Sequence, residues 1–532
     1  MSTAVTGRTI GGVRPGHAVQ SLLSMTVIVA CAVAVLVPHL ELRGVTVDEY
    51  ATYRLVTLHG WQQILEWAHT WDVNPPTHYL LLRFWSVMFG DSLPTLRAMN
   101  ILPTILSGFG VWWYLRRRGV GAAWAVAAGC SVVASPTLLY YSRMARYYSW
   151  PACFGAMAVL SYAEWRRTRG ARWLLLAGGF ELLCGYFHYL AWASLFLGIT
   201  IAMLMEWRRD KQDTLAWRHL VLARCAVLAL MTPLVIWNVY GILAQQISVG
   251  SRPGMARLAA SAVLAALYIP YGVWFSENFF PWDWWFSIPA VVLLLAIIGL
   301  RSKATADAGA RIWLATAVTG SLLAALVMTM VFRLEFRHAI VAVLWVSPLV
   351  SVWIWETLSM APPAAIRLAV ALGIVATQAL GIHAYYSYRD GMYPDVNWRQ
   401  VAGVLEGRAA PDDLIVTPGV RNTMVDGSLF DPYWSGETFS VIGDRAGTTD
   451  SPGLASFRRR LEQFSGKAVW LIDRPPTVGE AVEVRRLLNA RGLTPHLEAS
   501  LFPRDALARA SIDSLADKSV SYRLMVWRFA AP

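Results

Sequence analysis

Eleven runs of apolar residues, each about as long as a membrane is thick, constrain this sequence more than any other feature. They lie at about residues 21–40, 96–115, 121–141, 147–164, 172–188, 190–206, 219–241, 285–300, 312–332, 338–357 and 367–388. An α-helix needs about 20 apolar residues to cross the ~30 Å hydrocarbon core of a bilayer. The sequence therefore predicts a polytopic α-helical membrane protein with about eleven transmembrane helices.

The distribution of charge predicts how these helices are oriented. The 532-residue chain carries 46 Lys and Arg against 34 Asp and Glu, a formal net charge of +12. In a soluble protein this surplus would suggest a nucleic-acid partner. Here basic clusters follow alternate apolar runs, at 116–118, 166–172, 208–211 and 301–311. Because Lys and Arg collect in cytoplasmic loops, we predict a cytoplasmic N-terminus, a cytoplasmic (inner) membrane location and no nucleic-acid partner.

Three further segments are predicted to lie at or dip into the outer membrane interface, and two of them break the alternation. Apolar segments 77–90 and 258–275 would place later basic clusters outside if either crossed the membrane alone. Segment 59–71 is Trp-rich and amphipathic, as interfacial helices are. The run at 21–40 lacks a small-residue cleavage motif and is predicted to be an uncleaved first helix.

The last part of the chain has a different character. Residues 391–532 hold 17 basic and 17 acidic residues, so the surplus belongs entirely to residues 1–390. Apolar, β-branched runs at 414–417, 439–443, 468–473 and 522–529 predict strands, which alternate with helical patterns at 396–407, 453–464 and 478–490. We predict two domains: a transmembrane domain over 1–390 and a soluble, Rossmann-like periplasmic α/β domain over 391–532. The latter has no Gly-rich phosphate motif.

Two polar motifs follow the first apolar run. Asp48 and Glu49 are adjacent carboxylates beyond its predicted outer end, where they could act as a general base or hold a cation. Two solvated loop acids are the alternative. Asp72, Asn74 and His78 surround a pair of prolines at the start of segment 77–90. The prolines are explained by the start of a helix, whereas the polar residues around them are not.

Basic side chains on the side opposite the cytoplasmic loops form the next group. Arg143, Arg146 and Tyr147 lie at the outer end of the third run, and Arg337 and His338 repeat the pattern at the outer end of the ninth. Guanidinium groups bind phosphate through bidentate, charge-assisted hydrogen bonds. Anchors that reach the interface are the alternative for each arginine.

Two more polar residues lie in the stretch that ends the fifth run. His188 ends that run at the same predicted outer level, and Glu181 lies about two turns deeper. A carboxyl within the membrane is a functional candidate or a hydrogen-bonded structural group. Together, the polar residues of these motifs suit one outer cavity for a substrate with a lipid tail, a phosphate and a polar head.

Six segments in order resemble the GT-C glycosyltransferases that use polyprenyl-phosphate sugars, the group that contains protein O-mannosyltransferases and lipid A aminoarabinose transferases. The segments are 47–53, 72–85, 142–149, 187–191, 336–348 and 395–405. The resemblance implies a GT-C fold and transfer with inversion, in which Asp48 removes the proton of the acceptor hydroxyl. It also implies that Arg143, Arg146, Arg337 and His338 face the donor phosphate.

The resemblance gives the remaining polar residues secondary roles. Glu49 would orient the acceptor or, in metal-using members, help to bind a divalent cation. The sequence has no further metal-ligand motif, so no cofactor is assigned. Asp72, Asn74, His78, Tyr147 and His188 would bind substrate. The predicted partners are a polyprenyl-phosphate sugar, membrane lipid, and a glycan, lipid or protein acceptor.

Two other functions are compatible with parts of the pattern. A transporter or flippase of a lipid-linked sugar or phospholipid would also need arginines that face a phosphate, together with a polar route to the cytoplasmic side. A non-enzymatic assembly or sensor protein would use the C-terminal domain for binding. The sequence leaves the sugar and the acceptor open: arabinose, mannose and galacturonate suit the same carboxylate.

Overall fold

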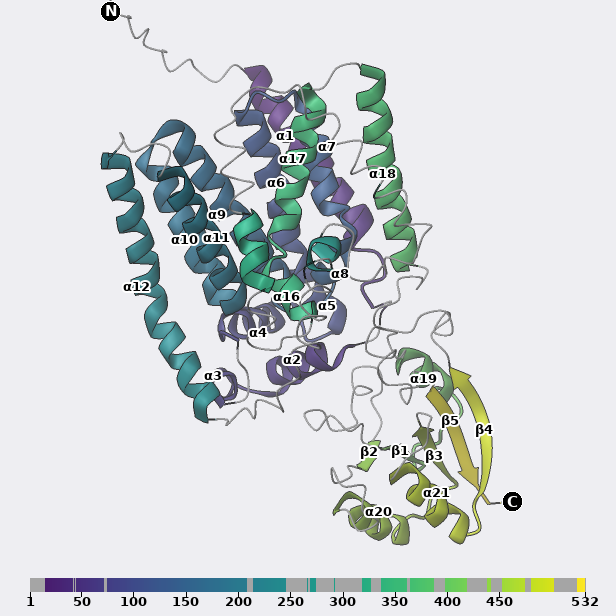
Figure 1. The fold of residues 1–532 in the computed structure, drawn as a ribbon. Helices are drawn as coiled ribbons and strands as arrows, with labels where there is room; N and C mark the ends of the chain where they lie inside the picture. The colour runs from purple at the N-terminus through teal and green to yellow at the C-terminus, as the bar shows by residue number, and fades with distance from the viewer. Residues whose placement is uncertain are drawn as a thin grey trace, which may run out of the picture.

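The structure, a computed structural model, describes residues 15–41, 43, 45–70, 74–207, 214–244, 266, 268–273, 291, 318–326, 336–360, 364–386, 398–418, 438–441, 452–473, 480–501 and 524–531. Most of this part forms a helix bundle, and the remainder forms a small sheet with helices (Figure 1). The helices that run along the bundle are α1 (Pro15–Leu36), α6 (Ile101–Arg117), α7 (Ala122–Val133), α9 (Ser149–Thr168), α10 (Ala171–Phe187), α11 (Tyr189–Trp207), α12 (Thr214–Ala244), α17 (Val346–Met360) and α18 (Ala364–Tyr386).

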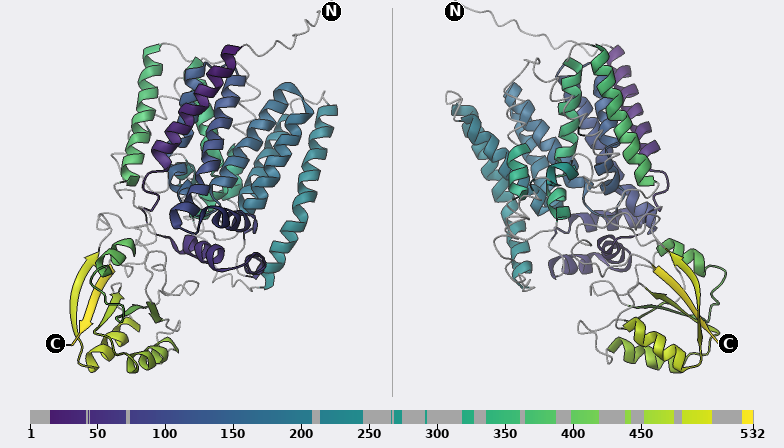
Figure 2. Two further views of the ribbon diagram at one scale, coloured as in Figure 1. Left: turned by 180° about the vertical axis from the view of Figure 1, so that it is seen from behind. Right: turned by 45° about the vertical axis from the view of Figure 1, so that its right-hand side comes forward.

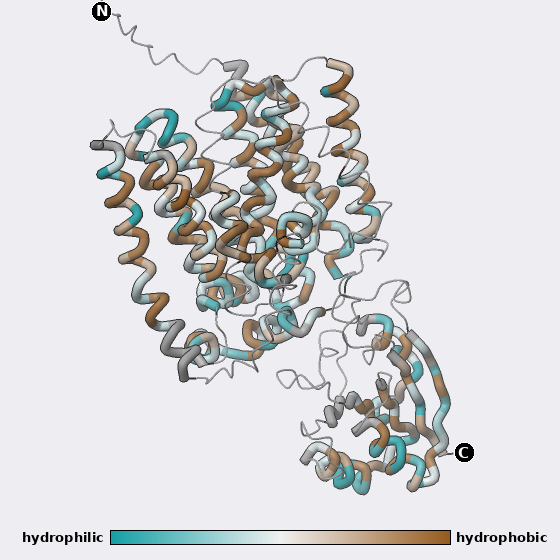
Figure 3. Tube along the Cα trace, viewed as in Figure 1, coloured by the Kyte–Doolittle hydropathy of each residue, from teal (hydrophilic) through white to brown (hydrophobic). Residues whose placement is uncertain are grey.

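Short helices gather toward one end of the bundle. They are α2 (Val47–Leu58), α3 (Trp61–Thr70), α4 (Thr77–Phe89), α5 (Leu93–Met99), α8 (Pro136–Ser142) and α16 (Phe336–Ala342). Figure 2 shows α2, α3 and α4 lying across the long helices at this end. Apolar residues run along the long helices, while polar residues concentrate toward the two ends (Figure 3). The predicted segments 59–71 and 77–90 therefore form transverse helices, as expected of interfacial ones.

Two of the basic clusters, at 116–118 and 166–172, lie together at the opposite end. Arg118, just after α6, forms a 3.2 Å ion pair with Glu356 of α17. Arg117 and Arg167 both pair with the buried Glu164 of α9, at 3.2 and 2.8 Å. These two clusters thus share one end of the bundle, while the clusters at 208–211 and 301–311 lie outside the described residues.

Where the structure describes them, the predicted spans coincide with helices in position but not all in length. Among the described residues, three helices are long and apolar enough to cross a membrane: Ala18–Leu36, Trp217–Trp237 and Ala364–Tyr386. A fourth span is formed if α7 and α8, bent by 51°, count as one. The count of eleven is not confirmed, because several apolar runs are interrupted. The run at 96–115 divides at Asn100, and the run at 338–357 divides between α16 and α17.

Several predictions fall where the structure gives no description. The span at 285–300, most of that at 312–332 and most of segment 258–275 lie outside the described residues. The same holds for Asp72.

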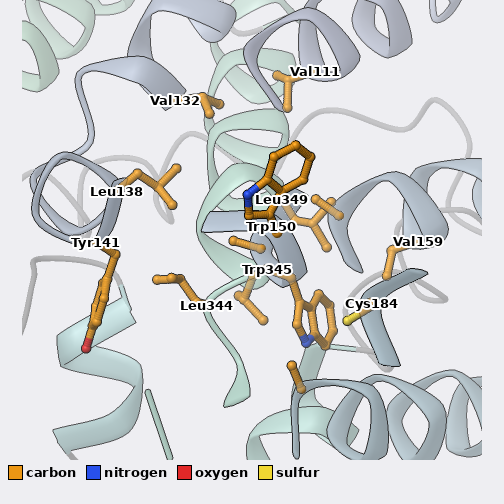
Figure 4. Close-up of a cluster of buried hydrophobic side chains, with 14 of the residues drawn as sticks. Val111, Val132, Leu138, Tyr141, Trp150, Val159, Cys184, Leu344, Trp345 and Leu349 are labelled. Atoms are coloured by element: carbon orange, nitrogen blue, oxygen red, sulfur yellow. The ribbon is translucent and has the colours of Figure 1, made fainter. Parts of the chain in front are cut away.

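The core of the bundle is built from interlocking apolar side chains. Trp150 of α9 and the fully buried Trp345 pack together with Leu349 of α17 at its centre (Figure 4). α6 and α7 approach closely because glycines face each other: a Cβ on Gly108 would lie 2.9 Å from the carbonyl oxygen of Gly129. Small residues at a helix crossing allow this approach in membrane proteins.

The C-terminal region is a five-stranded sheet with helices α19 (Trp398–Leu405), α20 (Pro452–Glu462) and α21 (Glu480–Ala490). The strands are β1 (Leu414–Pro418), β2 (Thr438–Val441), β3 (Ala468–Asp473), β4 (Thr494–Leu501) and β5 (Leu524–Ala530), in the order β2-β1-β3-β5-β4. β1 is parallel to β2 and β3, whereas β5 lies antiparallel between β3 and β4. The sheet is therefore mixed, which distinguishes it from an all-parallel Rossmann sheet.

Alternation along the strands gives this sheet two buried faces. Ile415 and Trp470 pack with α19 on one face, while Val416 and Leu471 pack with α20 and α21 on the other. Successive strand residues point to opposite faces, so strands covered on both sides are apolar throughout. This explains why β1 and β3 were predictable as continuous apolar runs.

Candidate active site

The two adjacent carboxylates lie in the first turn of α2. Thr46 caps this helix, and its hydroxyl accepts a hydrogen bond from the backbone nitrogen of Glu49 at 3.3 Å. Such a cap begins a helix, and the helix dipole favours acidic residues in the first turn. Asp48 is partly exposed, whereas Glu49 is completely buried. Because consecutive helix residues point about 100° apart, the two carboxylates meet different neighbours.

Both oxygens of Glu49 are engaged by the protein. Arg97 of α5 donates from Nε to Oε1 and from Nη2 to Oε2, each at 2.7 Å. The backbone nitrogen of Ala145 donates to Oε1, also at 2.7 Å. Arg97 further donates to the carbonyl oxygens of Leu40 and Arg43 at 2.6 and 2.9 Å. This buried ion pair therefore joins α2, α5, the connection before α2 and the connection after α8.

The connection between α8 and α9, residues 143–148, is held in place by Asn100. The Asn100 side-chain nitrogen donates to the carbonyl oxygen of Met144 at 2.7 Å. Ser149 donates to the Asn100 carbonyl oxygen at 2.8 Å, and the indole nitrogen of Trp150 donates to Asn100 Oδ1 at 3.0 Å. Buried backbone outside helices needs such partners, and here they fix a segment that carries two arginines.

Arg146 reaches from this segment to α2 and α4. Its Nη1 donates to Thr52 Oγ1 at 2.7 Å and to the hydroxyl of Tyr79 at 3.1 Å. Its guanidinium carbon lies 4.8 Å from the centre of the Tyr147 ring. Thr52 is one turn after Asp48, and Asp48 interacts electrostatically with Arg146. Arg146 is 7% exposed and its Nε has no hydrogen-bond partner, so this cation retains unused donor capacity.

Arg143 faces the opposite direction. It donates to the hydroxyl of Tyr386 and, at 2.5 Å, to the carbonyl oxygen of His39. Its guanidinium also lies 5.2 and 4.9 Å from the ring centres of Tyr385 and Tyr386. Arg143 thus connects the end of α1 with the end of α18, whereas Arg146 contacts α2 and α4.

Aromatic and imidazole rings lie beside Arg146. The ring of Tyr147 lies 5.9 Å from that of His78 and 5.0 Å from that of His188. His188, between α10 and α11, accepts a hydrogen bond at Nδ1 from the backbone nitrogen of Ala191 at 3.0 Å. His338 of α16 interacts electrostatically with His188. Helices distant in sequence thus bring four predicted site residues together.

His78 is buried as a neutral side chain. It is 0% exposed. Burial and the nearby Arg146 lower the pKa of His78 from 6.5 to about 3, and a backbone hydrogen bond with Ala145 opposes this shift more weakly. A neutral imidazole offers one donor and one acceptor, so His78 is able to bind a hydroxyl in either sense.

The predicted site residues therefore divide into groups. Six form one connected cluster: Asp48, Arg146, Tyr147, His78, His188 and His338. Glu49 and Arg143 face other partners. Asn74 is half-buried just before α4, and the side chain of Arg337, like Asp72, is outside the described part.

Three contributors were not expected from the sequence: Thr52, Arg97 and Asn100. Thr52 could have been found, because a residue four after Asp48 lies on the same helix face. Arg97 carried no such signal, since a single arginine in an apolar run resembles an interfacial anchor. Within the described residues, no three His, Cys, Asp or Glu side chains lie close enough to hold a metal ion.

The overall fold matches a solved structure. The chain aligns with the crystal structure of ArnT from Cupriavidus metallidurans in the apo state over 96% of its own length and 98% of the other, with a TM-score of 0.56 and 12% identity. It also aligns with ArnT from Cupriavidus metallidurans bound to undecaprenyl phosphate, over 97% and 98%, with a TM-score of 0.44 and 15% identity. No protein-family model matches the sequence, and no curated protein matches it.

The first alignment shows that the chain has an ArnT-like fold with a small C-terminal sheet. The predicted fold is thus confirmed. At 12% identity the likeness concerns the fold alone.

Proposed function

We propose that the chain is an integral-membrane, inverting glycosyltransferase. It would move a sugar from a polyprenyl-phosphate donor to a hydroxyl of a cell-envelope glycan, lipid or protein, on the outer side of the cytoplasmic membrane. One observation carries the proposal: Arg146, a buried cation with unused donor capacity, is held against the face of α2 that bears Asp48. A carboxylate base and an anion-binding group are what such a transfer needs.

Asp48 would act as the base. It takes the proton of the acceptor hydroxyl while that oxygen forms a bond to the anomeric carbon, on the face opposite the phosphate. The bond from the anomeric carbon to the phosphate oxygen breaks, and its electron pair leaves with the polyprenyl phosphate. The configuration at the anomeric carbon is therefore inverted. Glu49 has both oxygens engaged by Arg97 and Ala145, so the proton is assigned to Asp48 alone.

Arg146 would stabilise the leaving group. Negative charge develops on the phosphate as the bond breaks, and a fixed, buried guanidinium stabilises it without reorganisation. We assign Arg337 and His338 to the same phosphate, whereas Arg143, whose guanidinium binds Tyr386 and the His39 carbonyl oxygen, is not assigned to it. His78, Tyr147 and His188 would face the sugar, with His78 hydrogen-bonded to a hydroxyl and the rings packed against the pyranose or furanose. Asp72 and Asn74 would complete the substrate-binding surface.

The bundle supports the proposed side of the membrane. The site lies at the end that carries α2–α5, and the arginine clusters lie at the other end. Since basic loops stay in the cytoplasm, the N-terminus would be cytoplasmic, and the site and the C-terminal domain would be periplasmic or extracellular.

The decisive experiment compares Asp48→Asn with the wild type in cells that lack the protein. Mass spectrometry of envelope lipids, glycans and proteins identifies the species whose mass decreases by one sugar when the protein is absent. Wild type restores that mass, and Asp48→Asn does not, because removing a general base costs about 10²–10⁴ in rate. Asp412→Asn is a matched control, since Asp412 is an exposed residue of the C-terminal region.

Membrane level and thermal stability of each variant show that it is folded. Full restoration by a folded Asp48→Asn variant would exclude Asp48 as the base. A transporter gives a different result: purified protein in liposomes moves labelled undecaprenyl phosphate between leaflets without any acceptor, and Asp48→Asn leaves that movement unchanged.

A second measurement tests the phosphate site by binding alone. Undecaprenyl phosphate, with which ArnT from Cupriavidus metallidurans has been crystallised, is titrated into purified protein in detergent. Arg146→Met is expected to weaken binding by about tenfold or more, since charge-assisted contacts contribute about 1.5–3 kcal/mol. Arg459→Met, an exposed arginine of α20, is the control. Equal affinity in the two variants would exclude Arg146 from the phosphate site.

A further inference from the structure

We infer that Glu49 and Arg97 are positioning residues, which hold Asp48 and the segment that carries Arg146 in their reactive arrangement without touching substrate. The inference rests on the proposed function and deepens it. It separates the two neighbouring carboxylates of α2 by role: Asp48 for the chemistry and Glu49 for its support.

The geometry of Glu49 supports this role. It is 0% exposed, and its side chain spans the space between α2 and residues 143–148. The hydrogen bond at 2.7 Å to the backbone nitrogen of Ala145 acts on the residue directly before Arg146. Because Asp48 and Glu49 are consecutive in α2, one side chain fixes both reactive groups relative to each other.

Arg97 supports Glu49 from a second helix. The two parallel hydrogen bonds of 2.7 Å define the plane of the carboxylate, which a point charge such as Lys cannot do. The remaining Arg97 donors bind the carbonyl oxygens of Leu40 and Arg43, in the connection that leads into α2. Displacing reacting groups by about 1 Å can cost about 100-fold in rate, so a pair at this position affects catalysis without contacting substrate.

The test uses variants that separate support from chemistry. Glu49→Gln keeps an oxygen for the Ala145 nitrogen and most of the shape. In Glu49→Gln the retained oxygen can still accept from both the Ala145 nitrogen and Arg97 Nε. Glu49→Ala with Arg97→Met removes the support without leaving the buried unpaired charge that Glu49→Ala alone would leave. Transfer of the identified sugar is measured as kcat and as KM for the donor, with Asp48→Asn as reference.

The expected order is distinctive. Glu49→Gln lowers kcat by about tenfold or less, well short of the 10²–10⁴ expected for Asp48→Asn. The double variant lowers kcat by about 100-fold with KM for the donor changed less than threefold, in line with displaced groups. A loss in Glu49→Gln as large as that in Asp48→Asn would show that Glu49 takes part in the chemistry and overturn the inference.

Hydrogen exchange provides a readout that is independent of activity. Peptides covering residues 143–148 should lose protection in the double variant and keep it in Glu49→Gln, because only the double variant removes the acceptor of the Ala145 N–H. Unchanged protection together with unchanged kcat in the double variant would also overturn the inference. If the wild type transfers no sugar, the proposed function fails, while the exchange result still reports whether the pair holds the segment.

Discussion

A buried ion pair between α10 and α12 allows a strong test of how this bundle is stabilised. Arg224 donates from Nη1 to Glu181, and Tyr162 of α9 donates to the same carboxylate at 3.1 Å. Arg224 also donates to the carbonyl oxygen of Phe196 at 2.7 Å and to Thr200 of α11 at 3.0 Å. Four helices therefore meet at one ion pair.

The depth of the pair determines what each mutation costs. Glu181 and Arg224 both lie ten residues into their helices, about 15 Å along the axis and near the middle of a ~30 Å hydrocarbon layer. Glu181→Leu leaves a guanidinium that keeps its proton in any protein environment. A buried pair broken in this way typically loses about 3–5 kcal/mol.

The opposite mutation should be milder. In Arg224→Leu the carboxyl of Glu181 can take up a proton and keep its contact with Tyr162, so the loss falls to that of hydrogen bonds, about 1–3 kcal/mol. The double Leu variant leaves no charge and should be close to the wild type. We therefore expect the wild type and the double variant to be the most stable, Arg224→Leu to be less stable, and Glu181→Leu to be the least stable.

Thermal unfolding of the purified proteins in one detergent measures this order, and tryptophan fluorescence reports the transition. Arg367→Leu serves as a control for removing a bundle arginine, since within the described residues Arg367 makes only a long hydrogen bond, 3.4 Å, to the carbonyl oxygen of Ser359. Equal losses in the two single variants, or additive losses in the double variant, would refute the argument that an uncompensated charge dominates.

Three further results are expected from thermal unfolding. The pKa of His78 is lowered to about 3 in the folded protein, so between pH 3 and 6.5 only the unfolded chain binds a proton at this residue. The free energy of unfolding should therefore decline as the pH falls below 6.5, by at most about 1.4 kcal/mol per pH unit. His78→Leu should flatten this decline, and an unchanged slope would contradict the prediction. Gly108→Val should separate α6 from α7 and lower the free energy of unfolding by about 1–3 kcal/mol. Gly179→Ala is the control, because no atom lies within 4 Å of an added Cβ, and it should be neutral or stabilising. Equal effects of the two variants would contradict the close approach of α6 and α7. Asp413→Ala should destabilise the C-terminal sheet by about 1–3 kcal/mol, because Asp413 accepts hydrogen bonds at 2.9 Å from Ala410, Ala468 and Trp470. The control is Asp412→Asn at the exposed neighbouring residue, which should change stability by less than about 0.5 kcal/mol.

The C-terminal sheet shows where local pattern succeeds and where it fails. β3 begins and ends where its apolar run does, and α20 and α21 lie within two residues of the predicted segments. β4 was missed, because residues 494–501 mix polar and apolar residues and contain a bulge between Leu497 and Ala499. The insertion of β5 between β3 and β4 was also not predictable, since strand order depends on pairings between residues far apart in the chain.

The site shows the same division. Its motifs were recognisable, because carboxylates, arginines and histidines at the ends of apolar runs are rare without a function or a partner. The directions in which these side chains point were not recognisable from the sequence. Asp48 and Glu49 are neighbours, yet only Glu49 meets Arg97, 48 residues away, and Ala145, 96 residues away. Arg143 and Arg146 likewise separate toward different helices.

The sequence by itself determined that this is a helical membrane protein with a separate α/β region, and it determined which polar residues are candidates. Burial of apolar surface in the bilayer and in the sheet requires local periodicities, and these are visible along the chain. Only the tertiary structure decided where helices break and which side chains meet. Such contacts depend on partners that only folding brings together. The packing of α2, α4 and the segment before α9 therefore shows that Arg146 lies against the face of α2 that bears Asp48.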